Sequence, residues 1–279
     1  MTVLARGMRR AWRFPAMIAM LFIGLAITIF WFPFLDRQGR RPVIARWSRV
    51  LLICCGVRVQ VKIESGAPKW HTIGTDTGYL MLANHLSWLD IFVINGCAAA
   101  RFVAKSEIRD WPLAGVLVKR VGTLFIERGK RRSVHHVLHD IADHLQAPDL
   151  VAVFPEGTTS DGQALLPFHG NLIQAAIRTE TPVLPVGLQY FEADPAAPDG
   201  VGAISEVPLF IGDTTFVSSV WQIVAHPQII AKVTVLAPIH PDKEAHRHEV
   251  AAQARDVLRQ ALDLELEDTV PEGLIATRG

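Results

Sequence analysis

A histidine and an aspartate five positions apart are the residues of this chain best suited to acid–base chemistry. The apolar run 80–83 has strand character, a polar turn with His85 follows, and a second apolar run begins after Asp90. Two residues five apart in one helix point about 140° apart, so a direct bond requires the histidine in the turn. The carboxylate can then fix the ring tautomer and leave the other ring nitrogen free to take a proton. The pattern predicts a general base with its orienting acid.

A structural alternative accounts for part of the same pattern. Ser87 and Asp90 stand three positions apart ahead of an apolar run, which also fits a capping box at a helix start. In that interpretation Asp90 stabilises the helix and His85 is a turn residue without chemistry. The remaining motifs of the chain have to separate the two interpretations.

The elements that must position this pair alternate between strands and helices. After the first strand, the sequence predicts further strands at 102–105, 123–126, 150–154, 182–188 and 229–236, with a period-two strand before it at 57–63. A helix is expected to begin at Trp111 and Pro112. Further helices are expected at 133–146, 170–179, 216–225 and 246–266. This alternation predicts an α/β fold with a mostly parallel central sheet flanked by helices, preceded by an N-terminal membrane-docking helical segment. We expect residues 1–56 to form membrane-associated helices, 57–266 one domain, and 267–279 a tail.

The apolar run 150–154 is typical of a strand buried on both faces. It leads into a turn of small and polar residues that starts at Pro155 and Glu156. Open α/β sheets keep their ligand sites at the carboxyl ends of such strands. The plain alternative is a surface loop with a solvated Glu156.

Composition and charge point to a membrane surface. Half of the 279 residues are hydrophobic and the mean hydropathy is positive, which is high for a soluble enzyme. Nine arginines and one acid fall in the first 50 residues, so the rest of the chain carries a formal charge of about −7. A basic, apolar N-terminus on an acidic body favours anionic lipid head groups over nucleic acid as the partner.

The uncharged segment 14–35 is long enough to span a bilayer. The residues after it offer no small-x-small cleavage site, which argues against a secretory signal. Arginines flank the segment on both sides, so the positive-inside rule would hold both ends on the cytoplasmic face of a bacterial inner membrane. A second segment, about 42–61, alternates arginines with apolar residues as an interfacial helix would. A hairpin in one leaflet is slightly favoured over a single span.

Cysteine and histidine usage gives no sign of a disulfide framework or a metal centre. The three cysteines include no Cys-x-x-Cys pair and are expected to be reduced in a cytosolic compartment. His135 and His139 are four apart, a spacing that metal ligands use, but no acid is placed as a metallohydrolase would need. We interpret these histidines as part of a solvated helix face and expect no metal.

Four sequence blocks stand in a fixed order along the chain. They are Asn84-His85-x-x-x-x-Asp90, Gly122-Thr123-Leu124-Phe125-Ile126-Glu127-Arg128, Phe154-Pro155-Glu156-Gly157-Thr158 and Val183-Leu184-Pro185-Val186-Gly187. Together they closely resemble the glycerolipid acyltransferase family, which includes 1-acyl-glycerol-3-phosphate acyltransferases. The resemblance extends over about 57–239, and the basic, apolar N-terminus is similar to that family's membrane-docking helices.

The resemblance implies a mechanism in which His85, oriented by Asp90, deprotonates a lipid hydroxyl as it attacks an acyl thioester. No cofactor is implied beyond the acyl donor, acyl-CoA or acyl carrier protein. The matched positions imply substrate-binding roles for Glu156, Gly157, Thr158, Arg128 and Lys105. The alternative for Arg128 and Lys105 is that they are solvated charges at strand ends.

One position departs from the family pattern. The third block often continues Gly-Thr-Arg, with the arginine on the acceptor phosphate, whereas this chain has Thr159. The loss of a bidentate phosphate partner would weaken binding of a phosphate-bearing acceptor. The expected acceptor is 1-acyl-glycerol-3-phosphate, which would give phosphatidic acid, and the alternative is another lyso-lipid such as a lyso-ornithine lipid.

Two other classes of function remain as alternatives. A lipid hydrolase or thioesterase would use water in place of a lipid hydroxyl, but the sequence has no Gly-x-Ser-x-Gly nucleophile motif. A non-enzymatic membrane adaptor would not need the histidine–aspartate pair beside a complete Phe-Pro-Glu-Gly turn.

Overall fold

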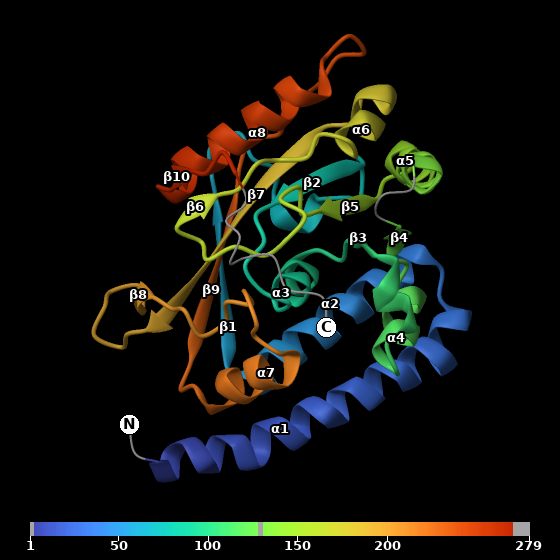
Figure 1. The fold of residues 1–279 in the computed structure, drawn as a ribbon. Helices are drawn as coiled ribbons and strands as arrows, with labels where there is room; N and C mark the ends of the chain where they lie inside the picture. Colours follow the sequence, from blue (N-terminus) through green and yellow to red (C-terminus); the bar gives the residue numbers. More distant parts are fainter. Residues whose placement is uncertain (1–2, 128–130, 270–279) are drawn as a thin grey trace.

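The computed structural model describes residues 3–127 and 131–269, and a central eight-stranded sheet runs through it (Figure 1). The strand order is β1-β9-β7-β2-β5-β3-β4, with β8 beside β7. The strands are β1 (Val57–Ile63), β2 (Tyr79–Ala83), β3 (Arg101–Lys105), β4 (Leu124–Ile126), β5 (Leu150–Val153), β7 (Val183–Ala193), β8 (Val201–Ile204) and β9 (Ile229–Val235). A separate two-stranded pair joins β6 (Ala164–Leu165) to β10 (Glu265–Leu266).

The sheet is mostly parallel, as the sequence predicts. Strands β7, β2, β5, β3 and β4 all run in one direction. Strand β9 is antiparallel to β7, and β1 is parallel to β9, so the two strands at that edge are reversed. The carboxyl ends of β2, β5, β3 and β4 therefore meet at one edge of the sheet.

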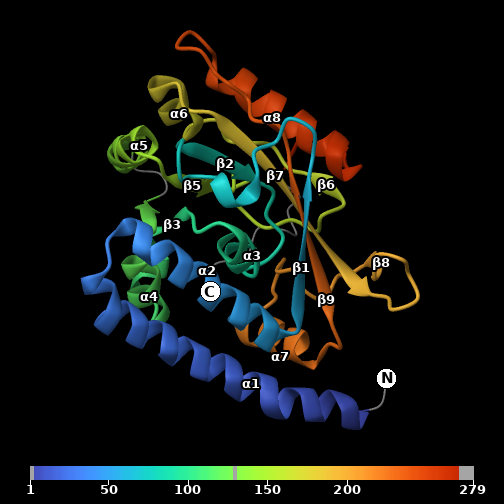
Figure 2. The same cartoon turned by 180° about the vertical axis from the view of Figure 1, so that it is seen from behind.

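Helices cover both faces of the sheet (Figures 1 and 2). They are α1 (Val3–Ala26), α2 (Arg37–Cys55), α3 (Asp90–Cys97), α4 (Ala114–Arg120), α5 (Arg131–Gln146), α6 (Ile173–Thr179), α7 (Phe216–Ala225) and α8 (Arg247–Leu262). Side chains alternate along β2: Met81 and Ala83 pack with α2, α3 and α7, whereas Leu80 and Leu82 pack with α5, α6 and α8. Because both faces are covered, the central strands are apolar at nearly every position.

The N-terminal segment is one long helical stretch that lies along the domain. Helix α1 continues through a π-helical segment (Ile27–Trp31) and a 3-10 turn (Phe32–Phe34), and α2 then runs back beside it. The stretch is long and apolar enough to cross a membrane by length and composition. It is nevertheless packed against α2 and α7 (Figure 1). Arg13 reaches from α1 to the carbonyls of His226 and Pro227, which ties the helix to the start of β9.

Some predicted element boundaries are wrong. The interfacial helix expected at 42–61 spans Arg37–Cys55, because Gly56 adopts a left-handed conformation (φ 78°) that ends it. The closing helix expected to reach residue 266 ends at Leu262, where Asp263 is left-handed, and β10 follows. The strand expected at 123–126 spans Leu124–Ile126 and is half-buried, since it lies at the edge of the sheet.

The first motif residue, Asn84, joins the end of β2 to β7. Its side-chain amide donates to the Leu188 carbonyl at 2.9 Å, and its side-chain oxygen accepts from the Leu188 N–H at 2.7 Å. Asn84 is 1% exposed, so neither backbone group has water as an alternative partner. The asparagine thereby fixes where the turn carrying His85 leaves the sheet.

Asn84→Ala should lower the free energy of unfolding by about 2–4 kcal/mol, because it leaves a buried N–H and a buried C=O without partners. The measurement is denaturant or thermal unfolding of the detergent-solubilised chain. Asn171→Ala, at an exposed turn residue, is the matched control and should change stability by less than about 0.5 kcal/mol. Equal stability of the two variants would contradict the proposed role of Asn84.

Candidate active site

The site is built where two central strands end side by side. Leu82 of β2 pairs with Val153 of β5, so the turn with His85 and the turn with Glu156 leave the same sheet edge together. The turn after β5 does not stay at the surface. The alternative of a solvated Glu156 is therefore wrong, because its side chain is 1% exposed.

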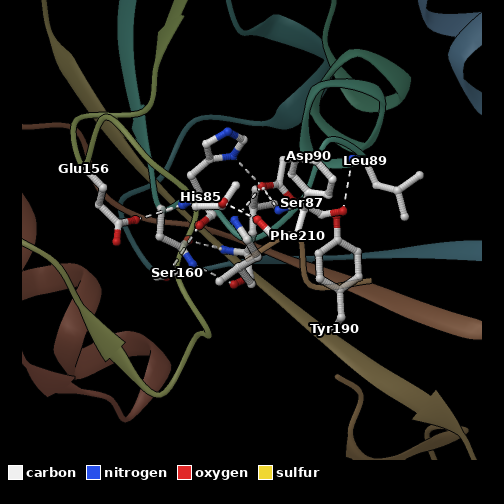
Figure 3. A network of polar contacts seen from close by, with 12 residues as sticks. His85, Ser87, Leu89, Asp90, Glu156, Ser160, Tyr190 and Phe210 are labelled. Carbon is white, nitrogen blue, oxygen red and sulfur yellow. Dashed lines mark hydrogen bonds and ion pairs between the residues drawn. The ribbon is translucent and has the colours of Figure 1, made fainter. Parts of the chain in front are cut away.

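His85 and Asp90 are in direct contact (Figure 3). The distance from His85 Nδ1 to Asp90 Oδ2 is 2.8 Å, and Asp90 is the first residue of α3. A carboxylate only accepts, so Nδ1 carries the proton of the neutral ring and Nε2 holds the free lone pair. Among the residues that the structure describes, none hydrogen-bonds to Nε2. The predicted geometry of a base and its orienting acid is present.

The capping interpretation is correct only in placing Asp90 at the helix start, since the N-cap of α3 is Leu89 and no side chain caps it. Asp90 Oδ2 accepts from the backbone N–H of Leu86 at 2.7 Å and of Ser87 at 2.9 Å. Both donors belong to the turn that precedes the helix. These bonds fold the turn around the carboxylate and hold the His85 backbone within reach of the acid.

A tyrosine that the sequence analysis missed completes the surroundings of the acid. Tyr190 of β7 donates its hydroxyl to Asp90 Oδ1 at 2.6 Å, and both side chains are buried. Burial and the neighbouring Asp90 raise the pKa of Tyr190 well above 10, so the hydroxyl stays protonated and acts as a donor. No local motif marks Tyr190, because it is 100 positions from Asp90 and is one of the side chains of an apolar strand.

Aromatic packing sets the orientation of the imidazole from its other side. The His85 ring stacks on Phe154 with a centroid distance of 3.9 Å and an interplanar angle of 10°. Phe154 in turn stacks on Phe102 of β3 at 5.8 Å. The His85 side chain keeps 19% of its surface exposed, so the ring is held firmly and is still reachable from solvent.

Glu156 supports the histidine through the backbone. Its Oε1 accepts from the His85 N–H at 2.8 Å and its Oε2 from the Leu166 N–H at 3.2 Å. Burial raises the pKa of Glu156 from 4.5 to about 8, although both N–H groups favour the charged form. The structure thus gives Glu156 a positioning role, and contact with an acceptor stays a prediction.

The rest of the third block closes over the same turn. The Ser160 N–H donates to the His85 carbonyl at 2.8 Å, so both backbone groups of the histidine are held by this loop. Gly157 has a φ of 70°, which suits glycine in a tight turn. Thr158 is half-buried, and the Thr159 hydroxyl donates to the Phe210 carbonyl.

The remaining predicted binding residues are basic. Lys105 is the last residue of β3, at the same sheet edge as His85, and its side chain is exposed. Arg128 lies outside the described residues. The predicted roles of Lys105, Gly157, Thr158 and Arg128 in substrate binding stay predictions.

The histidine-rich face of α5 lies apart from the motifs. His135 and His139 are both exposed, and His139 Nδ1 lies 3.1 Å from Asp143 Oδ2. Within 3–127 and 131–269, no three His, Cys, Asp or Glu side chains are grouped so as to hold a metal ion.

The raised pKa of Glu156 predicts a pH-dependent stability. Between pH 4.5 and about 8 the folded chain keeps a proton on Glu156 that the unfolded chain releases, so the free energy of unfolding falls as pH rises through this window. Glu156→Gln removes this titration, and the stability of wild type relative to the variant should fall across the window and level off above it. Unfolding measured at several pH values tests this. The control Glu265→Gln, at an exposed residue, should show the same dependence of the free energy of unfolding on pH as wild type. The prediction is contradicted if Glu156→Gln also keeps the wild-type dependence.

Comparison with known proteins places the chain in a family. A family model described as Acyltransferase matches residues 58–189. A lyso-ornithine lipid O-acyltransferase of Pseudomonas aeruginosa is 34% identical over 230 residues, covering 82% of each chain. A 1-acyl-sn-glycerol-3-phosphate acyltransferase of Neisseria gonorrhoeae is 33% identical over 191 residues, covering 67% of this chain and 72% of that protein.

The fold has a counterpart among solved structures. The crystal structure of the 1-acyl-sn-glycerophosphate acyltransferase of Thermotoga maritima superimposes with a TM-score of 0.59 at 19% identity, covering 91% of this chain and 96% of that one. That likeness concerns the α/β architecture, while the family model spans all four motif blocks. The chain belongs to the acyltransferase family of enzymes.

Proposed function

We propose that this acyltransferase moves a fatty acyl group from acyl-CoA or acyl carrier protein to the free hydroxyl of a lyso-lipid at the cytoplasmic face of a bacterial membrane. The observation that carries the proposal is the His85–Asp90 pair, with Nε2 unbonded among the described residues and the ring partly exposed. Such a base suits the deprotonation of an alcohol and needs no metal or covalent intermediate.

The proposed reaction has one tetrahedral intermediate. The lipid hydroxyl gives its proton to His85 Nε2 as its oxygen attacks the thioester carbonyl, and Asp90 stabilises the imidazolium that forms. Collapse of the intermediate breaks the carbon–sulfur bond, and the departing thiolate takes the proton back from the ring. Because a thiol leaves readily, alignment and deprotonation are the main contributions required of the protein.

For the acceptor, 1-acyl-glycerol-3-phosphate is our first candidate. It is supported by the four motif blocks and by the Neisseria relatives, whose names give that substrate. A lyso-ornithine lipid is the second candidate, for a specific reason. Thr159 supplies no positive charge to the loop, and its hydroxyl is bonded to the Phe210 carbonyl. Lyso-ornithine lipid acyltransferases from four organisms also match this chain. One of these matches covers 94% of this chain.

The proposed membrane contact is a surface that includes α1, its extension to Phe34, and α7. Apolar side chains along α1 and its extension are exposed, among them Phe30 at 72% and Phe34 at 84%. Val217 of α7 is 72% exposed. Since α1 lies along α2 and α7 rather than projecting from the domain, a hairpin seated in one leaflet fits better than a single span.

His85→Ala should lower acyl transfer by about 10³-fold or more, because it removes the base. The test gives the purified enzyme one labelled acyl thioester and a panel of acceptors: 1-acyl-glycerol-3-phosphate, a lyso-ornithine lipid, other lyso-phospholipids, and no acceptor. His71→Ala, at an exposed histidine, should keep wild-type activity.

Three outcomes of this panel would count against the proposal. Full activity in His85→Ala with an intact fold would remove the assigned base. Equal thioester consumption with and without acceptor would favour a hydrolase or thioesterase. No turnover with any lyso-lipid would favour an adaptor.

Tyr190→Phe should lower kcat about tenfold while leaving KM for the acceptor nearly unchanged, because Asp90 loses one charge-assisted hydrogen bond of about 1.5–3 kcal/mol. Without this bond Asp90 is held less firmly and orients the His85 ring less well for proton transfer, while contacts to the acceptor are unchanged. Tyr79→Phe, at the other tyrosine of the chain, is the control and should change neither kcat nor KM. A kcat of Tyr190→Phe equal to that of wild type would reduce Tyr190 to a packing residue.

A further inference from the structure

A second polar site lies at the amino-terminal ends of the parallel strands, whereas His85 lies at their carboxyl-terminal ends. A cavity of about 160 Å³ lies between the turn that joins the N-terminal helices and the amino-terminal ends of β3 and β5. Arg101 begins β3 and Asp149 precedes β5, whereas His85 follows the end of a strand parallel to both. The cavity is therefore separate from the acyl-transfer site.

Positive charge dominates this cavity. Among the described residues that line it are five arginines and two acids. The arginines are Arg37, Arg40, Arg41, Arg101 and Arg120, and we call them the arginine cluster. Asp149 pairs with Arg37 and, at 2.6 Å, with Arg101, while Asp36 accepts from the Gly39 N–H as the cap of α2. The cluster keeps a formal excess of three positive charges.

Burial and neighbouring positive charge both act on the groups around this cavity. Desolvation, together with repulsion from Arg101 and Arg41, lowers the pKa of Arg37 to about 10. Burial and the nearby arginines lower the pKa of His144 to about 4, so this neighbour of Asp149 is neutral. The amino terminus of α2 adds the positive end of a helix dipole.

Structural bonds use only part of the donor capacity of the cluster. Arg40 donates to the carbonyls of Leu35 and Phe32, and Arg120 donates to Thr28 at 3.3 Å. Each guanidinium has five N–H groups, so further donors remain. Arg37 Nε is buried with no acceptor among the described residues. A backbone carbonyl needs a hydrogen-bond donor but not a positively charged one. Bonds that hold the helices to the domain therefore do not by themselves explain why five arginines gather here.

The position of the cavity indicates where an anion would come from. It opens beside the turn that follows exposed Trp31 and Phe34, the apolar end of the surface that we assign to the membrane. Lipid phosphates lie at the depth where apolar anchors give way to basic residues. We propose that the arginine cluster binds the phosphate of an anionic membrane phospholipid, and so fixes the N-terminal helical hairpin at the head-group layer.

The test uses the full-length enzyme in mixed micelles and follows thermal unfolding by tryptophan fluorescence. Phosphatidylglycerol is titrated against a phosphatidylcholine background, and inorganic phosphate is titrated in parallel. A ligand that binds only the folded state raises the unfolding midpoint with concentration. Phosphatidylglycerol should raise the midpoint of the wild type in a saturable way.

Arg37→Gln/Arg120→Gln should raise the phosphatidylglycerol fraction needed for half of the shift about tenfold or more, since charge-assisted bonds to phosphate are lost. The charge-matched control is Arg46→Gln/Arg58→Gln, at two exposed arginines outside the cavity, which should respond like wild type. If the double variant fails to fold, Arg120→Gln alone serves, because it leaves both partners of Asp149 in place and should show a smaller loss in the same direction.

Two results would overturn the proposal. An equal response of the cluster variant and its charge-matched control would show that the lipid acts through general surface charge. A full shift with inorganic phosphate, to which phosphatidylglycerol adds nothing, would show that the ligand is a soluble anion rather than a lipid.

Discussion

The buried carboxylate of Asp90 is the constraint on which the site depends. A charged group with no exposed surface requires several hydrogen-bond donors. Asp90 has four, from the His85 ring, two backbone N–H groups of the turn, and Tyr190. Three of these donors come from the turn after β2 and the fourth comes from β7, so the carboxylate joins the central sheet and the His85 imidazole in one unit. The same contacts explain how one aspartate can both fold the turn before α3 and hold the His85 ring.

Much of the fold and the core of the site could be predicted from the sequence, because their signals are local. The apolar runs of β2 and β5 and the spacing from His85 to Asp90 predicted a strand, a turn and a helix start, and these are confirmed. The signals failed where long-range contacts decide. Tyr190 reaches Asp90 only through the register of β7 beside β2. The early end of α8 goes with the pairing of the residues after it, Glu265 and Leu266, with β6, which no periodicity reveals.

The two edges of the parallel strands carry different chemistry. The carboxyl-terminal edge presents one partly exposed imidazole held by neutral and acidic groups, which suits an uncharged hydroxyl. The amino-terminal edge presents the arginine cluster, joined directly to the hairpin. An enzyme that acts on lipids has to hold its position on the bilayer while substrates and products exchange. Separate sites for anchoring and for chemistry allow both without competition for the same residues.

The pairing of β1 with β9 has a consequence for biosynthesis. Val57 lies beside Ile229, so the strand that follows the hairpin gains its partner only after most of the polypeptide has left the ribosome. Such distant pairing is slow, and domains of this size expose apolar surface while it is pending. In the proposed membrane arrangement, the basic, apolar N-terminal segment reaches the bilayer long before the sheet can close, and the nascent enzyme completes its folding while already attached.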